Sequence, residues 1–297
     1  MAKKKLITHN GKFHTDDVFA CATLCLLLES HKESYEIIRT RDEEIVRGGN
    51  YVFDVGGVND PKADKFDHHQ TGGAGKRENG LEYASFGLVW MKYGEELCGS
   101  KKVADYIDKK MIASIDAQDN GVDVFATTYP NILPYAIWDA FGSYLPTWRE
   151  DESAMDSIFL EVVALAKKIL QREITRAQAK VEAEALVEKV YAESPDKRLI
   201  VLDVYYPWRD VLMKYPEPLF VVTPRVGGKW DLQTVQVSNN SFKSRKDLPA
   251  SWGGLSNEDL QKITGVPDAI FCHRSLFLAG ASSKEGILKL AELALNN

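Results

Sequence analysis

The segment from Asp17 to Glu29 constrains the fold most, because it is predicted to be a helix with apolar residues over most of its surface. A helix of this kind must be covered by other elements of the protein. Short strand patterns flank it, at Leu6–His9 and Tyr35–Arg39, and a third at Tyr51–Gly57 ends in a glycine turn. Alternating strands and helices predict an α/β fold with a parallel sheet.

The rest of the chain predicts a second unit joined by a long helical segment. Residues 152–192 carry apolar side chains at the spacing of three and four that is typical of one or two amphipathic helices. We therefore expect three regions: a parallel-sheet N-terminal domain at 1–150, a helical connector at 151–194 and a smaller α+β domain at 195–297. Other expected elements are helices at 82–93 and 102–117, strands at 199–204, 220–223 and 230–237, and a strand, glycine turn and helix over 269–295.

Composition excludes some classes of protein. The chain has 297 residues and a formal net charge of −6, which does not favour broad, sequence-independent binding to nucleic acid but leaves room for a local basic groove. No apolar run approaches the roughly 20 residues of a membrane span. The basic start, Met-Ala-Lys-Lys-Lys, is not followed by the apolar region of a secretory signal, so an intracellular protein of cytoplasm, nucleus or mitochondrion is expected. Cys21 and Cys25, four residues apart, are predicted to pack in the core.

Candidate metal ligands concentrate in four short segments. These are His9–Asp17, Asp54–Gly57, Phe66–Gln70 and Ile115–Gly121. Four of the six histidines fall in the first and third segments, and imidazole with carboxylate, without thiolate, suits manganese, zinc or iron. Several carboxylates that can bridge suggest two metal ions, about 3.5–4 Å apart in phosphatases and nucleases. Any one of these residues alone is more often a helix cap or a turn former.

The order of these motifs resembles the DHH phosphoesterase superfamily, which is named after the triplet Asp67-His68-His69. More closely, the chain resembles the melanocyte-proliferating-gene family, described as a metal-dependent exonuclease of DHH type. The similarity continues through Gly87–Trp90 and Phe271–Arg274 to Gly286, and so spans essentially the whole chain. It implies a DHH-type N-terminal domain.

The resemblance also implies roles for the residues. Asp67 would be a bridging ligand or a carboxylate behind the ligands, and His69 would face the scissile phosphate as a catalytic residue. Asp119 could replace Asp116 as ligand, a choice that the sequence leaves open. The implied cofactor is two Mn²⁺ ions, with Mg²⁺ or Zn²⁺ as alternatives. The implied ligands are His9, His14, Asp16, Asp54, His68 and Asp116.

Two departures from the family pattern affect these expectations. His14 stands where general DHH enzymes have an aspartate, which exchanges an anionic ligand for a neutral one. Thr71 follows Gln70, where the close family commonly has a basic residue. The phosphate contact expected there has therefore either moved to Lys76 and Arg77 or is absent.

A second candidate substrate element lies near the C-terminus. The segment Cys272–Gly286 is predicted to contain a strand, a turn of small residues and a helix start, which together can bind an anion through backbone N–H groups. His273, Arg274 and Lys284 would add positive charge, and Arg225 is a weaker candidate. The alternative is an ordinary helix capped by Ser282 or Ser283.

The motifs themselves predict a metal-dependent phosphoester hydrolase in which a metal-activated hydroxide attacks phosphorus. The resemblance implies a 3′–5′ exonuclease acting on RNA or another oligonucleotide. The alternatives are a small-molecule phosphatase or pyrophosphatase, and a metal-binding scaffold without catalysis. The sequence does not indicate the oligomeric state.

Overall fold

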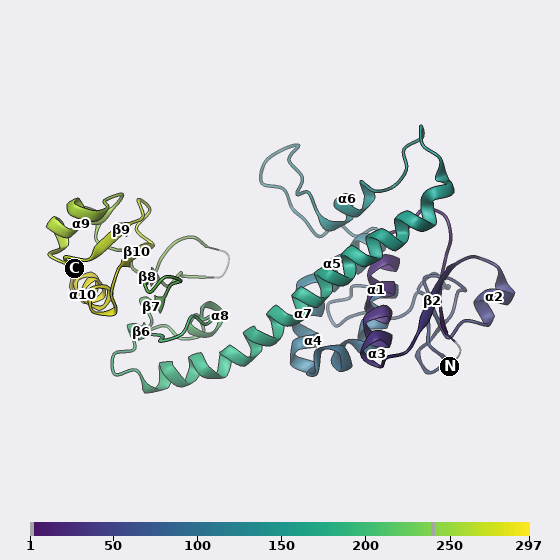
Figure 1. Ribbon diagram of the computed structural model, residues 1–297, viewed down its shortest axis with the longest axis horizontal. Helices are drawn as coiled ribbons and strands as arrows, with labels where there is room; N and C mark the ends of the chain where they lie inside the picture. The colour runs from purple at the N-terminus through teal and green to yellow at the C-terminus, as the bar shows by residue number, and fades with distance from the viewer. Residues whose placement is uncertain (1–2, 239–240) are drawn as a thin grey trace. The chain divides into compact units, whose positions relative to one another are not determined.

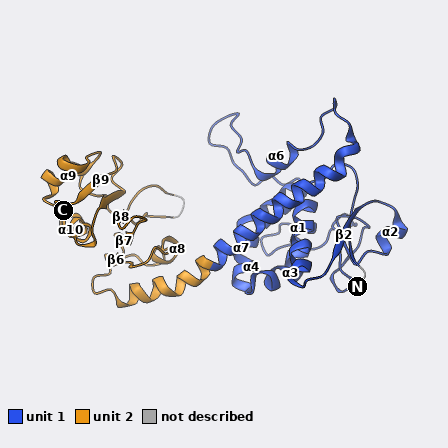
Figure 2. Cartoon of the chain, viewed as in Figure 1, with its two compact units in different colours: residues 1–178 blue, residues 179–297 orange. Residues whose placement is uncertain are grey.

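The computed structural model describes residues 3–238 and 241–297, so Met1 and Ala2 of the basic start lie outside the described residues. The chain divides into two compact units, Met1–Gln178 and Ala179–Asn297 (Figure 2). Helix α7 (Met155–Glu193) contributes residues to both units. This single continuous helix covers most of the connector predicted at 151–194. The predicted ends of the N-terminal domain at 150 and of the connector at 194 stay a prediction.

The first unit is built on a five-stranded sheet in the order β2-β1-β3-β5-β4. Strands β1 (Lys4–Thr8), β2 (Tyr35–Arg39), β3 (Tyr51–Phe53) and β5 (Lys65–Phe66) are parallel, as predicted. The edge strand β4 (Asn59–Asp60) is antiparallel to β5. A three-residue 3-10 turn joins β4 to β5, which is too short for the crossover that a parallel pair needs. The sheet is therefore mixed.

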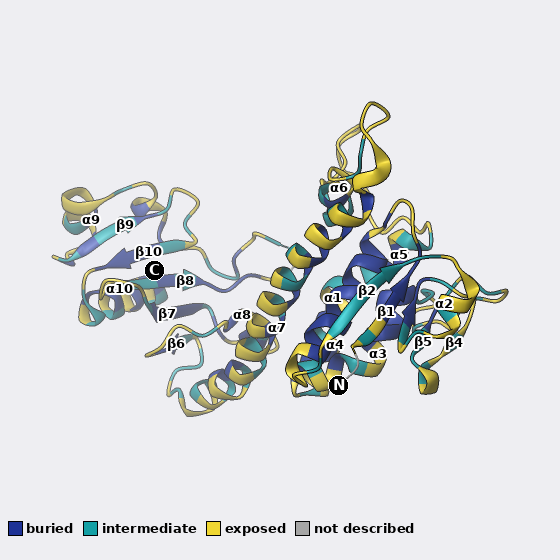
Figure 3. Ribbon diagram, turned by 45° about the vertical axis from the view of Figure 1, so that its right-hand side comes forward, coloured by how far each residue is buried: buried dark blue, intermediate teal, exposed yellow. Residues whose placement is uncertain are grey.

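Helix α1 (Thr15–Ser30) lies at the centre of this unit. Every residue from Thr15 to Leu28 is buried, which confirms the prediction of a covered helix (Figure 3). It packs against α3 (Ser85–Cys98) and α5 (Ala113–Asp119), and Phe19 stacks on Phe86. Cys21 and Cys25 are buried free thiols in this core, as predicted.

The remaining elements of the unit are short. The helix predicted at 102–117 is present as α4 (Lys101–Ile107), a π turn (Asp108–Ile112) and α5. Residues 120–136 form an irregular connection before α6. The first half of α7 packs on this unit through the Phe13–Phe159 contact and the Arg39–Asp156 ion pair (Figure 1). The other short elements are α2 (Glu43–Arg47), α6 (Ile137–Gly142) and 3-10 turns at Pro61–Ala63 and Glu152–Ala154.

The second unit carries its own mixed sheet, in the order β6-β7-β8-β10-β9. Only β6 and β7 are parallel. The C-terminal segment contains two strands, β9 and β10, before its helix, whereas the sequence predicted one. No described helix has the length and apolar character needed to cross a membrane. The elements are β6 (Leu199–Val201), α8 (Arg209–Leu212), β7 (Phe220–Pro224), β8 (Trp230–Thr234), a 3-10 turn (Ala250–Trp252), α9 (Asn257–Thr264), β9 (Ala269–Cys272), β10 (Leu278–Ala281) and α10 (Lys284–Asn296).

Candidate metal centre

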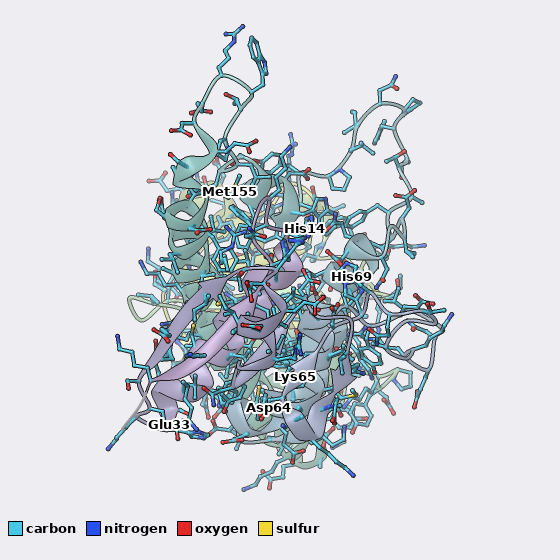
Figure 4. All side chains as sticks on the ribbon, turned by 90° about the vertical axis from the view of Figure 1, so that its right-hand side faces the viewer. His14, Glu33, Asp64, Lys65, His69 and Met155 are labelled. Carbon is cyan, nitrogen blue, oxygen red and sulfur yellow. The ribbon has the colours of Figure 1, made fainter. Side chains whose placement is uncertain are left out.

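Polar side chains follow three neighbouring parallel strands of the first unit. His9 comes directly after β1, Asp54 after β3 and Asp67 after β5. Because the carboxyl ends of parallel strands meet at one edge of a sheet, these residues are brought together there. Asp54 adopts a left-handed backbone conformation, with φ of +54°, that turns the chain into the loop ending at Gly57. In Figure 4, His14 and His69 lie at this end of the unit, opposite Glu33 and Asp64 at the other end.

The start of α1 adds two buried carboxylates to this edge. The Asp17 carboxylate accepts a hydrogen bond from the His14 backbone N–H at 2.8 Å, which fixes the first turn of the helix. Its other oxygen lies 3.3 Å from His9 Nε2. The Asp16 carboxylate accepts from the N–H groups of Ser85 and Phe86, at 3.1 and 2.8 Å, and so caps the N-terminus of α3. The favourable interaction of a carboxylate with a helix N-terminus explains why α3 begins here.

Three groups of potential ligands form within the cluster. In each group the three ligand atoms lie within 4.8 Å of one another. Asp54 is shared by the first two groups and His68 by the last two, so the three positions are continuous. The groups are His9, His14 and Asp54; Asp54, His68 and His69; and Asp16, His68 and Asp119.

Several buried atoms in the cluster lack a hydrogen-bond partner in the described structure. They include His9 Nε2, His68 Nε2, Asp17 Oδ2 and Asp54 Oδ2. The other ring nitrogen of His9, Nδ1, donates to the backbone carbonyl of Asn10 at 3.1 Å, which leaves Nε2 as the ligand atom facing the carboxylates. His68 Nε2 lies 3.3 Å from Asp54 Oδ1 and 3.1 Å from Asp119 Oδ2. Buried nitrogen and carboxylate oxygen atoms that converge in this way without hydrogen bonds fit a divalent cation.

The electrostatics of the cluster indicate the same need for positive charge. Burial would lower the pKa of His9, but the Asp17 and Asp54 carboxylates outweigh it and raise the pKa to about 10. Burial would likewise lower the pKa of His68, but the Asp119 and Asp54 carboxylates raise this pKa to about 11. Burial, with the nearby Asp119 and Asp54, holds the pKa of Asp16 well above its ordinary value. Buried carboxylates in this number need a compensating cation.

Asp67 and His69 form a pair at the margin of the cluster, where His69 Nδ1 also lies 3.5 Å from Asp54 Oδ1 of the second ligand group. Asp67 is buried, and its carboxylate accepts from Gly57 N–H at 2.6 Å and from His69 Nδ1 at 2.8 Å. Among the described residues, Asp67 belongs to none of the three ligand groups. The His69 side chain is 60% exposed, and it lines the adjacent cavity. Asp67 therefore orients His69 toward open space.

Asp116 has different partners from Asp119. Its carboxylate receives Arg77 Nη1 at 2.6 Å and the Gly87 N–H at 3.1 Å, and it belongs to none of the ligand groups of the described chain. Burial raises the pKa of Asp116 to about 7, although Arg77 opposes this effect. The structure thus brings Asp119, rather than Asp116, to His68.

Arg77 was predicted to bind substrate, but its side chain is only 9% exposed. Its guanidinium pairs with Asp116 and with Asp108 of the π turn, and it lies 4.3 Å from the ring centroid of Tyr83. Lys76, the other basic residue of this loop, is exposed and pairs with Glu82 at 2.8 Å. Through these ion pairs, Arg77 connects the loop after Gln70 to the π turn and to α5.

A cavity of about 710 Å³ opens beside the cluster. It is lined by His9, His14, Asp54, Asp67 and His69 of the cluster and by Arg41, Glu43 and Arg47, at and before α2. No role was predicted for Asp17, Arg41 or Arg47 from the sequence. The signal for Arg41 is its position just beyond β2, at the same edge of the sheet as His9.

The candidate residues of the second unit are exposed or engaged locally. Arg274 is exposed, Arg225 lies 3.7 Å from Asp231, and Lys284 pairs with Asp203. His273 Nδ1 accepts a hydrogen bond from the backbone N–H of Ser275 at 3.1 Å. None of these contacts identifies a ligand.

The start of α10 is a capped helix. Ser283 Oγ accepts from the Gly286 N–H at 3.0 Å, and Asp268 accepts from the Ser283 N–H and Oγ at 2.8 and 2.6 Å. A Cβ on Gly286 would lie 2.0 Å from Asp268 Oδ1, so this carboxylate packs directly against the first turn. An anion at this helix start would have to displace Asp268.

Comparison with known proteins gives matches over nearly the whole chain. The model of an uncharacterised protein family, UPF0160, matches residues 5–295. The human MYG1 exonuclease is 31% identical over 331 aligned residues, which cover 99% of this chain and 86% of that protein. The MYG1 proteins of Dictyostelium discoideum and Saccharomyces cerevisiae are 27% and 29% identical; the alignments cover 100% and 98% of this chain, and 98% and 96% of those proteins.

Proposed function

Because the chain belongs to the MYG1 exonuclease family, UPF0160, we propose that it is a metal-dependent hydrolase that removes nucleotides from the end of a nucleic acid strand. The observation that carries the proposal is the convergence of buried His9, His68 and Asp54 atoms, which make ion pairs but no hydrogen bond, beside an open cavity. A scaffold without catalysis has no need of such an opening.

The donor set would hold two ions. His9, His14 and Asp54 would hold one, and Asp16, His68 and Asp119 the other. When bound, such ions lower the pKa of a coordinated water and neutralise charge on the phosphoryl oxygens. Imidazole with carboxylate suits manganese, zinc or iron, and the resemblance to the family implies Mn²⁺, with Mg²⁺ and Zn²⁺ as alternatives.

His69 would act on the leaving group. The 2.8 Å contact between His69 Nδ1 and Asp67 supports this role, because a proton on Nδ1 that is donated to the carboxylate leaves Nε2 free to face a substrate in the cavity. A proton on Nε2 can pass to the departing oxygen, and the Asp67 carboxylate stabilises the imidazolium that carries it. Asp67 would therefore be a positioning residue rather than a ligand.

The finer assignment, RNA cut in the 3′–5′ direction, rests on the resemblance of the motifs to the exonuclease family. The arginines at the mouth of the cavity support a polyanionic substrate despite the net charge of −6. We also keep the prediction that the second unit, through His273, Arg274, Lys284 or Arg225, binds the rest of the strand.

A nuclease assay tests the proposal. The protein is stripped of metal, reloaded with Mn²⁺, Mg²⁺ or Zn²⁺, and given RNA labelled at either the 5′ or the 3′ end. Stepwise release of mononucleotides from the 3′ end, lost in His68→Ala and kept in the control His31→Ala, is expected. His31 suits as control because it lies at the opposite end of α1 from the cluster and pairs with Glu96. Release of inorganic phosphate alone from small esters would instead indicate a phosphatase, and no product with any metal a scaffold.

A further inference from the structure

Arg41 lies beside the metal cluster because of the strand order. The Thr40 N–H donates to the Thr8 carbonyl at 2.8 Å, which extends the β1–β2 pairing by one residue beyond β2. The same register, continued past the strands, places Thr40 opposite His9 and Arg41 opposite Asn10. Strand β2 lies on one side of β1, and β3, with Asp54, lies on the other. Arg41 therefore lies at the same edge of the sheet as Asp54, on the opposite side of β1.

The Arg41 guanidinium has few partners. Its Nη1 donates to the Asn10 carbonyl at 2.9 Å, and the same carbonyl accepts from His9 Nδ1. Within residues 3–238 and 241–297, no carboxylate lies within ion-pair distance of Arg41, whereas Arg47 pairs with Glu43 and Arg39 with Asp156. Arg41 is exposed, and four of the five donors of a guanidinium are left for a ligand.

The setting of these donors matches a phosphate group. Arg41 lines the cavity together with His14 and His69, and one carbonyl group separates it from the ligand His9. A guanidinium binds phosphate through paired hydrogen bonds and keeps its charge at all relevant pH values. A phosphate on the metal ions would thus have a second anion site next to it.

We propose that Arg41 binds the phosphate one nucleoside away from the scissile phosphate, so that the site selects substrates with two neighbouring phosphates. This inference rests on the proposed function, because it takes the cluster to hold the scissile group. It gives the substrate class: a phosphodiester chain, or a dinucleotide with a terminal phosphate, rather than an isolated phosphoester.

Steady-state kinetics test the selectivity. The substrates are the dinucleotide ApA, with one phosphate, and its forms with an added 5′ or 3′ phosphate. The wild-type protein should show a lower KM for one of the two phosphorylated forms. Arg41→Ala should raise that KM roughly 10- to 100-fold, the loss expected for a hydrogen bond to a charged group, and leave ApA within about twofold. Arg41→Lys should restore part of the effect. The control Arg198→Ala, an arginine paired with Asp196 in the second unit, should show none.

Two results would overturn the inference. If Arg41 only holds the Asn10 carbonyl and thereby His9, then Arg41→Ala will lower bound manganese and slow ApA and the phosphorylated forms equally. If the added phosphate leaves the wild-type KM unchanged at both ends, there is no second phosphate site.

A binding measurement separates this inference from the proposed activity. Adenosine 3′,5′-bisphosphate has two phosphates one nucleoside apart and no phosphodiester bond, whereas AMP has one phosphate. Calorimetry on the manganese-loaded protein should give tighter binding of the bisphosphate, by roughly 10- to 100-fold, and Arg41→Ala should remove the difference. Equal affinities in the wild-type protein contradict the site at Arg41. Selective binding without any hydrolysis of RNA or dinucleotides would leave the site standing and reject the nuclease.

Discussion

Gly87→Ala tests whether the contact between α3 and Asp116 supports the cluster. A Cβ at Gly87 would lie 2.0 Å from Asp116 Oδ2 and 2.9 Å from the Tyr83 ring. Asp116 is fully buried and paired with Arg77, so the carboxylate has no open space into which it can move. The substitution should therefore break the Arg77–Asp116 pair and the Gly87 N–H hydrogen bond.

The expected cost follows from these contacts. Loss of a partner in a buried ion pair costs about 3–5 kcal/mol, and the higher helix propensity of alanine returns about 1 kcal/mol. The net destabilisation is then about 2–4 kcal/mol, which for a unit of this size lowers the melting temperature by roughly 4–16 °C. Thermal unfolding followed by circular dichroism measures it.

Gly142→Ala is the matched control, because Gly142 ends helix α6 and a Cβ there would meet no atom within 4 Å. It should change stability by less than about 1 kcal/mol. A second check repeats Gly87→Ala in an Asp116→Ala background, where most of the added cost should disappear. A melting temperature for Gly87→Ala equal to that of Gly142→Ala would refute the argument.

Five further substitutions separate the roles of the candidate residues. His68→Ala should reduce bound manganese and abolish turnover, whereas His69→Ala should keep the metal and lower kcat by roughly 10²–10⁴; equal metal loss in both would refute the assignment of the pair. Asp119→Ala should reduce the metal content measured by elemental analysis, while Asp116→Ala should lower the melting temperature with the metal retained, and the reverse pattern would make Asp116 the ligand. Arg274→Ala should raise KM with metal content and melting temperature unchanged, whereas unchanged kinetics would leave that segment as an ordinary hairpin and capped helix.

Much of the fold could be predicted because it depends on local patterns. The apolar residues over most of the surface of α1 predicted a helix buried among other elements. The alternation of strands and helices predicted a parallel sheet. That sheet order then placed His9, Asp54 and Asp67 at one edge. The antiparallel β4 was missed because a two-residue strand leaves almost no periodic signal. Strand β10 was missed because its mostly small residues, Leu278–Ala281, were taken as a turn.

The parts of the site that could not be predicted depend on distant partners. Asp116 and Asp119 are three residues apart on α5, a spacing that puts both on the same helix face, so only Arg77, Gly87 and His68 distinguish them. Arg77 was taken as a substrate residue because sequence alone does not place Asp108 beside it. Arg41 belongs to no recognisable motif, and its relation to His9 comes from the pairing of β1 with β2.

Anomalous diffraction at the manganese edge, from a crystal soaked in Mn²⁺, tests the central claim most directly. The account predicts two peaks per chain, about 3.5–4 Å apart, one bonded to His9, His14 and Asp54 and the other to Asp16, His68 and Asp119. If no peak appears at these residues, whether manganese binds elsewhere in the crystal or not at all, the result contradicts a metal-dependent hydrolase built on this cluster.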